Sequence, residues 1–210
     1  MKVIKDGEER RKEILLTARQ LFVQKGYDHT SVNDILKIID IAKGTFYYYF
    51  SSKEEVLQAI IVDVVNEGAA RAEHVLRDTS IPLINRIALA VMAQTPEFEG
   101  ALKLADEIHK VDNAKFEQLY RITMLTKMTL VLEGAMKEAQ EQDIIHTDFP
   151  KECIESILLL GHMMFDCNTF SWKAEEYPVK MKAFLCNAER MFGTKPGEFQ
   201  GFMEMFRMEE

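Results

Sequence analysis

The sequence predicts an all-α protein in which a few short N-terminal helices precede a larger helical body. Apolar residues recur every three or four positions along most of the 210-residue chain, as they do on one face of a helix. Serine, proline and glycine stand where these periodic segments begin and end. In addition, no segment has a convincing strand pattern and no internal repeat is present.

The first two helices are marked by their end signals. Helical spacing of apolar residues predicts a first helix over about Glu8–Lys25, and Gly26 supplies its left-handed end. Ser31 and Asp34 have the spacing of a capping box, with Asp in place of the more usual Glu. We therefore expect a short second helix over about Val32–Ile39.

A segment over residues 43–50, which ends in five consecutive aromatic residues, 46–50, follows after a connection of only three residues, 40–42. Phe46 and Phe50 are four positions apart, so on a helix they share a face and are expected to enter a core. Two short helices joined by a turn of three or four residues have helix-turn-helix geometry. The aromatic run is therefore predicted to form the second helix of that motif.

The three tyrosines of this run are expected to be exposed together, because the phenylalanines use the buried face. Lys43, Thr45 and Lys53 lie close to them in the sequence. Phenolic hydroxyls beside positive charge are the composition expected where a short helix meets a phosphate backbone. The alternative, in which the rings only complete a small core, is disfavoured by the turn spacing and the flanking lysines.

The body is predicted to consist of longer helices. Ser52 and Glu55 form a second capping box, which starts a helix reaching to about Leu76. Thr95-Pro96 ends one later helix, and Pro150 and Pro178 begin others. The later helices are expected over about 83–94, 97–110, 114–141, 150–172 and 178–192, with a short terminal helix within 191–207.

The first 60 residues resemble the TetR family of bacterial transcriptional regulators. The motifs that carry the resemblance are Gly26-Tyr27, Thr30-Ser31-Val32, Asp34-Ile35, Gly44-Thr45-Phe46-Tyr47-Tyr48-Tyr49-Phe50 and Ser52-Lys53-Glu54-Glu55. The resemblance implies a three-helix DNA-binding domain, residues 1–53, followed by a helical-bundle domain, residues 54–210, that binds an effector and dimerises. The DNA contacts that it implies are Lys43, Gly44, Thr45, Tyr47, Tyr48, Tyr49 and Lys53.

Two residues of the turn depart from the family pattern, which usually has glycine in the turn and a small hydroxyl residue before the recognition helix. Here these positions hold Asp40 and Ala42. Asp tolerates the left-handed conformation better than most residues, so the turn is expected to survive. Ala42 cannot make a capping or phosphate hydrogen bond, so we expect the operator contacts to shift toward the tyrosines.

Composition and charge fit this interpretation. With 47% hydrophobic and 29% charged residues, no run of about 18 apolar residues and no signal peptide, the sequence predicts a soluble cytoplasmic protein that does not span a membrane. The total charge is −8, yet residues 1–53 hold 10 Lys and Arg against 7 Asp and Glu, a net +3. A basic N-terminal segment on an acidic body is expected to approach phosphates with the correct end.

No catalytic or cofactor motif appears. The i,i+3 pair Asp106/His109 and the i,i+4 pair His162/Asp166 each supply half a metal site at most, so hydrogen-bonded pairs are the preferred interpretation. The three cysteines, Cys153, Cys167 and Cys186, lie in apolar helices and are interpreted as packed thiols, with a redox pair as the alternative. The predicted protein is therefore not an enzyme and holds neither metal nor cofactor.

The last two long helices, about 150–172 and 178–192, are apolar on more than one side. Such helices are buried on several sides, and a second copy of the chain would supply the extra cover, although burial within one core is the alternative. The family resemblance implies the same homodimer. Two recognition helices about 34 Å apart would then bind a pseudo-palindromic operator in double-stranded DNA.

The 12 methionines and several aromatic residues suit an adaptable cavity for a small apolar or amphipathic effector, and equally suit a filled core. Together with the resemblance they predict a repressor that leaves its operator when the effector shifts the helix that starts at Lys53. The alternatives are a helical carrier or enzyme, and a regulator controlled by a protein partner. The predicted lining is Met92, Leu102, His109, Phe116, Tyr120, Met124 and Met163.

Overall fold

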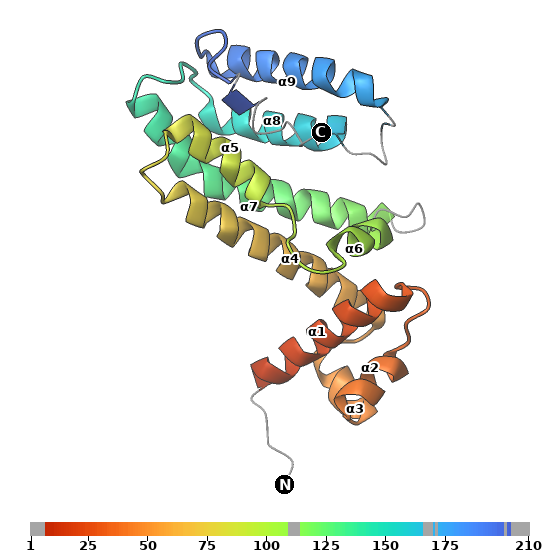
Figure 1. The fold of residues 1–210 in the computed structure, drawn as a ribbon. Coiled ribbons are helices and arrows are strands. Elements are labelled where there is room, and N and C mark those ends of the chain that lie inside the picture. The colour runs from red at the N-terminus through yellow and green to blue at the C-terminus, as the bar shows by residue number, and fades with distance from the viewer. Residues whose placement is uncertain (1–6, 109–113, 166–169, 171, 200, 203–210) are drawn as a thin grey trace. The chain divides into compact units, whose positions relative to one another are not determined.

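The computed structural model describes residues 7–108, 114–165, 170, 172–199 and 201–202. These residues form helices and loops, without a strand. None of the described helices combines the length and the apolar character needed to cross a bilayer. The elements in Figure 1 are α1 (Gly7–Lys25), α2 (Val32–Ile39), α3 (Lys43–Tyr49), α4 (Lys53–Leu76), α5 (Leu83–Ala93), α6 (Ala101–Ile108), α7 (Ala114–Glu141), α8 (Pro150–Phe165), η2 (Ala174–Glu176) and α9 (Tyr177–Phe192).

The chain packs as two compact units. The first unit is formed by Met1–Asn66 and Pro96–Thr123, and the second by Glu67–Thr95 and Met124–Glu210. Helices α4 and α7 each contribute residues to both units. The two units are defined by how the chain packs. The division into a DNA-binding domain, 1–53, and an effector-binding and dimerisation domain, 54–210, stays a prediction.

A single apolar core holds the first unit together. It combines residues of α1, α2, α3, the first part of α4, α6 and the start of α7. Phe46 and Phe50 are 0% and 2% exposed, which confirms that the ends of the aromatic run enter the core. Burying two phenylalanine side chains contributes on the order of 2–3 kcal/mol each, which is enough to fix a helix as short as α3. Figure 1 shows α2 and α3 lying together in orange, beside α1.

Helix α6 begins four residues later than the predicted start at Glu97. The backbone of Gly100 has φ +87°, a left-handed conformation, and the helix begins at the next residue. A Cβ atom at this position would lie 2.1 Å from Cγ1 of Val23 on α1. The close approach of the two segments therefore requires glycine here, and the predicted start was wrong because that contact joins residues far apart in the sequence.

In the second unit, Arg86 joins three elements. The residue is 6% exposed, and its side chain donates hydrogen bonds to the carbonyl oxygens of Leu76, at 2.8 Å, and Ile81, at 3.1 Å. It also pairs with Glu138 of α7 at 2.8 Å. The guanidinium thus satisfies the carbonyl at the end of α4 while it holds α5 against α7, and a buried charge is tolerated because it is paired.

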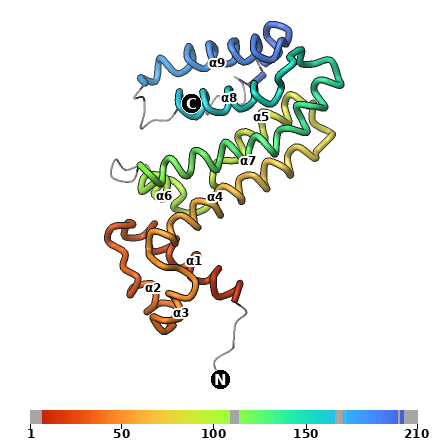
Figure 2. The backbone as a smooth tube through the Cα atoms, turned by 180° about the vertical axis from the view of Figure 1, so that it is seen from behind, coloured from red at the N-terminus to blue at the C-terminus, as the bar shows by residue number. Residues whose placement is uncertain are grey.

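Helices α8 and α9 lie side by side in the second unit, as Figures 1 and 2 show from opposite directions. They come close at Gly161, where an added Cβ would lie 3.1 Å from the ring of Phe184. The ring of Phe184 also meets Phe165 edge to face, with centroids 5.5 Å apart. One face of each helix is thereby buried within the chain.

The predicted helix over 150–172 is too long. Helix α8 ends at Phe165 among the described residues, and Trp172 is not helical. The indole Nε1 of Trp172 donates to the carbonyl of Met164 at 2.7 Å, so it satisfies a carbonyl at the helix end. The sequence interpretation treated Trp172 as one more apolar helical residue and missed this cap. Within 191–207, where a short terminal helix was expected, residues 200 and 203–207 lie outside the described residues, and the described residues 194–199 form no helix.

We expect Arg86→Met to lower the free energy of unfolding by about 2–4 kcal/mol, because it leaves two partly buried carbonyl groups without the donor that Arg86 supplies. Arg77→Met is the matched control, since the Arg77 side chain is 78% exposed and pairs with Glu73 at the surface at 3.3 Å, and its effect should stay below about 0.5 kcal/mol. Urea denaturation of both variants measures the difference. Equal stability of the two variants would contradict the role given to Arg86.

Candidate nucleic-acid interface

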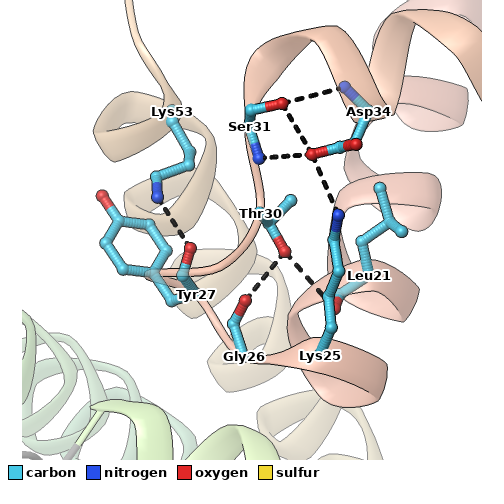
Figure 3. Close-up of polar contacts among 8 residues, drawn as sticks. All are labelled: Leu21, Lys25, Gly26, Tyr27, Thr30, Ser31, Asp34 and Lys53. Atoms are coloured by element: carbon cyan, nitrogen blue, oxygen red, sulfur yellow. Dashed lines mark hydrogen bonds and ion pairs between the residues drawn. The ribbon is translucent and has the colours of Figure 1, made fainter.

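The turn between α1 and α2 is fixed by side-chain hydrogen bonds to its backbone (Figure 3). Gly26 has φ +89° and ends α1 with an N–H bond to the carbonyl of Phe22. The hydroxyl of Thr30, which is 2% exposed, donates to the carbonyl of Gly26 at 2.8 Å, with the Leu21 carbonyl 3.5 Å away. The chain is thus held in one conformation before α2 begins.

The capping box predicted at α2 is present. The backbone N–H of Asp34 donates to the Ser31 hydroxyl at 3.2 Å, and the backbone N–H of Ser31 donates to the Asp34 carboxylate at 2.8 Å. Lys25 at the end of α1 adds an ion pair to Asp34 at 2.9 Å. Hydrogen bonds from Ser31 and then from Lys25 hold the pKa of Asp34 well below its usual value, so the carboxylate remains ionised and the cap persists at neutral pH.

The turn between α2 and α3 confirms the expectation for Asp40. Its backbone has φ 50° and ψ 55°, and its N–H donates to the carbonyl of Leu36. Asp therefore adopts the left-handed conformation in the place where the family usually has glycine. Ala42 is the N-cap of α3 and makes no side-chain cap, as its methyl group requires.

The three tyrosines of α3 differ in exposure. All three were expected to be exposed together. Tyr48 is 82% exposed and Tyr47 is 47% exposed. Tyr49 is only partly exposed, because it packs against the core of the first unit. The rings of Tyr48 and Tyr49 meet edge to face with centroids 5.0 Å apart, which supports the exposed ring from one side.

The start of α3 carries the other predicted contact residues. Lys43 is exposed, and its Nζ lies 5.8 Å from the centroid of the Tyr47 ring. Apart from its chain neighbours and its own helix backbone, no described residue has an atom within 4 Å of a Cβ built at the exposed Gly44, so the space beside this backbone is open. Thr45 is partly exposed and donates its backbone N–H to the carbonyl of Ala42 at 2.9 Å. Together with the tyrosines, these residues form one polar surface with a positive charge.

Lys53 has a partner within the chain. Its Nζ donates to the carbonyl of Tyr27 at 2.7 Å and lies 4.0 Å from the centroid of the Tyr27 ring (Figure 3). Burial lowers the pKa of the Lys53 ammonium, and the carboxylates of Asp28 and Glu107 oppose that shift. The sequence pattern suggested a phosphate contact here because it gave no sign of a partner 26 residues away.

The start of α4 contains one half of the predicted capping box. The backbone N–H of Glu55 donates to the hydroxyl of Ser52 at 3.1 Å. The Glu55 carboxylate instead accepts from both the backbone N–H and the hydroxyl of Ser51, at 2.6 and 2.7 Å. These bonds lower the pKa of Glu55 and join Ser51, which follows the C-cap of α3, to the first turn of α4.

Of the residues predicted to line an effector pocket, those that the structure describes are divided between the two units. Leu102 is 82% exposed, and Phe116, 1% exposed, belongs to the core of the first unit together with the partly buried Tyr120. Met92, Met124 and Met163 belong to the second unit, and Met124 is 4% exposed. His109 lies outside the described residues. Apolar composition alone did not separate core residues from candidates for a cavity.

The described residues contain no group of three or more His, Cys, Asp or Glu side chains placed to hold a metal ion. His109 and Asp166, each half of a proposed pair, lie outside the described part, as does Cys167. Cys153 is a buried free thiol whose Sγ lies 3.3 Å from the Met191 carbonyl oxygen, and Cys186 is a partly exposed free thiol. The packed-thiol interpretation therefore holds for Cys153.

One contact beside this surface was missed by sequence reasoning. The carboxylate of Glu107 on α6 accepts the backbone N–H of Tyr27 at 2.9 Å, across 80 residues of sequence. Glu107 was predicted to lie in a helix and received no role. No local spacing signals such a bond, since it depends on how α6 packs against α1.

Two family models match the chain. Residues 14–60 match "Bacterial regulatory proteins, tetR family", and residues 101–186 match "Tetracyclin repressor-like, C-terminal domain". The first range contains α2 and α3 with the turn between them. The second range begins with α6 and reaches into α9.

Individual transcriptional regulators are also similar to this chain. The HTH-type transcriptional regulator YuxN of Bacillus subtilis is 50% identical over 54 residues, 26% of this chain, and the match spans only 19% of the relative's length. The HTH-type transcriptional repressor DhaR of Mycobacterium sp. is 23% identical over 71% of this chain and 76% of its own. The structure of a transcriptional regulator from Cytophaga hutchinsonii has the same fold, with a TM-score of 0.64 and 19% identity over 90% of this chain and 98% of that one. The chain therefore belongs to the TetR family of bacterial DNA-binding transcriptional regulators.

Proposed function

We propose that the protein is a homodimeric repressor that binds a pseudo-palindromic operator through α3 and releases it when a small apolar or amphipathic effector binds the helical body. The observation that carries the DNA-binding part is the division of α3 into two faces. Phe46 is fully buried, whereas Tyr48, four-fifths exposed, lies near the open backbone of Gly44. A rigid helix with an exposed hydrogen-bonding face suits a groove of duplex DNA.

The residues of α3 that we propose to contact DNA are those whose side chains or backbone are exposed. Tyr47, Tyr48 and Thr45 offer hydroxyl groups, Lys43 offers a charge for a phosphate, and Gly44 admits a close approach of the backbone. Tyr49 is the weakest member of the predicted set because its ring is partly covered by the core.

We place the dimer interface on α8 and α9. These helices pack on each other through Gly161 and Phe184, yet Leu159 and Leu160 remain 44% and 42% exposed and Val179 remains 69% exposed. Apolar side chains left on the outer side of two adjacent helices support burial against a second copy of the chain. Two copies are needed because one short recognition helix contacts only a few base pairs.

The effector site is proposed near the methionines of the second unit, Met92, Met124 and Met163. Thr129 of α7, also in the second unit, offers a polar group to an effector, because its hydroxyl is buried and makes no hydrogen bond with the described residues. A polar group of a bound effector would satisfy that hydroxyl, while the thioethers adapt to its apolar part. Binding would favour a shifted position of α4, and the spacing of the two recognition helices would change.

Tyr48→Phe should weaken binding to a DNA fragment selected from the source genome by about three- to tenfold, because it removes one hydrogen-bonding hydroxyl from each subunit. The matched control is Tyr177→Phe, since Tyr177 is also an exposed tyrosine but lies on α9. Fluorescence anisotropy with labelled duplex DNA measures both affinities. The contact assignment is wrong if Tyr48→Phe and Tyr177→Phe bind equally well.

Leu160→Glu should separate the dimer, because it places a charge in an apolar interface. Light scattering coupled to size exclusion is then expected to give the mass of one chain, 24.2 kDa, where the unsubstituted protein gives twice that mass. Leu16→Glu on α1 changes a leucine of similar exposure, 52%, and should leave the dimer intact. A Leu160→Glu protein that remains dimeric would place the interface elsewhere.

A further inference from the structure

We infer that Glu107 and Lys53 are positioning residues for DNA recognition, because together they hold the backbone N–H and the carbonyl of Tyr27, from which α2 and α3 are oriented. Lys53 then acts within the chain and does not contact a phosphate. The inference rests on the proposed function, since it concerns how the same surface is kept in its binding conformation.

Both hydrogen-bonding groups of Tyr27 are engaged by side chains from distant parts of the sequence. The Glu107 carboxylate on α6 accepts its N–H at 2.9 Å, and the Lys53 ammonium on α4 donates to its carbonyl at 2.7 Å. The carboxylate also lies close to Gly26, where an added Cβ would meet Oε1 at 3.3 Å. Charged partners make these bonds stronger than ordinary backbone hydrogen bonds.

The side chain of Tyr27 is held as firmly as its backbone. Its ring meets Phe22 and Phe116 edge to face, with centroid distances of 5.2 and 5.7 Å, and Lys53 covers it at 4.0 Å. Burial is the main cause that raises the pKa of the Tyr27 phenol. The ring of Tyr27 is therefore anchored to α1 and α7, while side chains of α6 and α4 bind its backbone N–H and its carbonyl.

The backbone of Tyr27 controls the start of α2. The carbonyl of Tyr27 also accepts the N–H of Thr30 at 3.1 Å, and the next residue, Ser31, is the N-cap of α2. Helix α2 continues into α3 after only three residues. A shift of the Tyr27 peptide would therefore move the capped end of α2 and, with it, the exposed tyrosines.

Helix α6 is itself fixed against α1, so its position and that of Tyr27 are linked. Gly100 packs against Val23, and the guanidinium of Arg19 lies 4.7 Å from the centroid of the Phe98 ring. The segment that carries Glu107 follows α5 of the second unit in the sequence. Glu107 thus gives the later part of the chain a direct hydrogen bond to the turn that precedes α2.

The first experiment separates a positioning lysine from a phosphate-binding one. Operator affinity is measured as a function of salt for Lys53→Met and Lys43→Met, using the genomic fragment that the wild-type protein selects. Lys43→Met should reduce the slope of log affinity against log salt by about 0.9 for each phosphate that the protein no longer neutralises. Lys53→Met should weaken binding about tenfold with the slope unchanged. A reduced slope for Lys53→Met would show that this lysine binds a phosphate and would overturn its assignment.

The second experiment concerns Glu107. Glu107→Ala should weaken operator binding about tenfold without a change of salt slope, and Glu107→Gln, which keeps an acceptor oxygen, should restore affinity to within about threefold. Glu117→Gln makes the same charge change on α7, where Glu117 pairs with Arg121, and should bind like the wild type. Wild-type affinity of a folded Glu107→Ala protein, judged by circular dichroism, would overturn the inference, as would a Glu107→Gln protein that binds no better than Glu107→Ala.

Hydrogen exchange at the Tyr27 amide gives a measurement that needs no DNA. Exchange should become faster in Glu107→Ala and stay slow in Glu117→Gln, because only the first variant removes the acceptor of that N–H. If the exchange rate of the Tyr27 amide is unchanged in Glu107→Ala, the role given to Glu107 is wrong, even if the protein binds DNA. A wild-type protein that selects no DNA fragment, with exchange as expected, instead contradicts the proposed function.

Discussion

Helix α3 contains seven residues, too few to be stable in water without tertiary contacts. Its place in the first unit depends on the burial of Phe46 and Phe50 in the apolar core, and that burial also determines which side chains of α3 are exposed. Because the two phenylalanines fix the rotation of the helix about its axis, Tyr48 is directed outward and Tyr49 inward. The same apolar contact thus supplies both stability and the orientation of the polar face.

The turns that flank this helix show a second requirement, which is that short helices need their backbone groups satisfied by specific partners. Asp34 and Ser31 close the first turn of α2, and Asp40 takes the left-handed conformation after its last turn. Glu55 performs the corresponding task between Ser51 and α4. The carboxylates of Asp34 and Glu55 remain ionised because hydrogen bonds lower their pKa, so the surface keeps its geometry near neutral pH.

The packing units do not follow the order of the sequence. Helix α6 and the start of α7 share a core with the N-terminal helices, although residues 67–95, which lie between them in the sequence, belong to the other unit. Tyr27 lies at the centre of this arrangement, where Glu107 accepts its backbone N–H and Lys53 donates to its carbonyl. These hydrogen bonds join segments that are far apart in the sequence and that local structure alone would not bring together.

The sequence by itself determined the short helices and their ends, since capping residues, glycine stops and apolar spacing act over a few neighbouring positions. It therefore predicted α2, the three-residue turn and the buried faces of Phe46 and Phe50. Tertiary structure decided what depends on packing between distant residues: the start of α6 against Val23, the cap that Trp172 gives to α8, and the engagement of Lys53 with Tyr27. A lysine and its partner 26 residues away leave no periodic pattern, because only the folded chain brings them together.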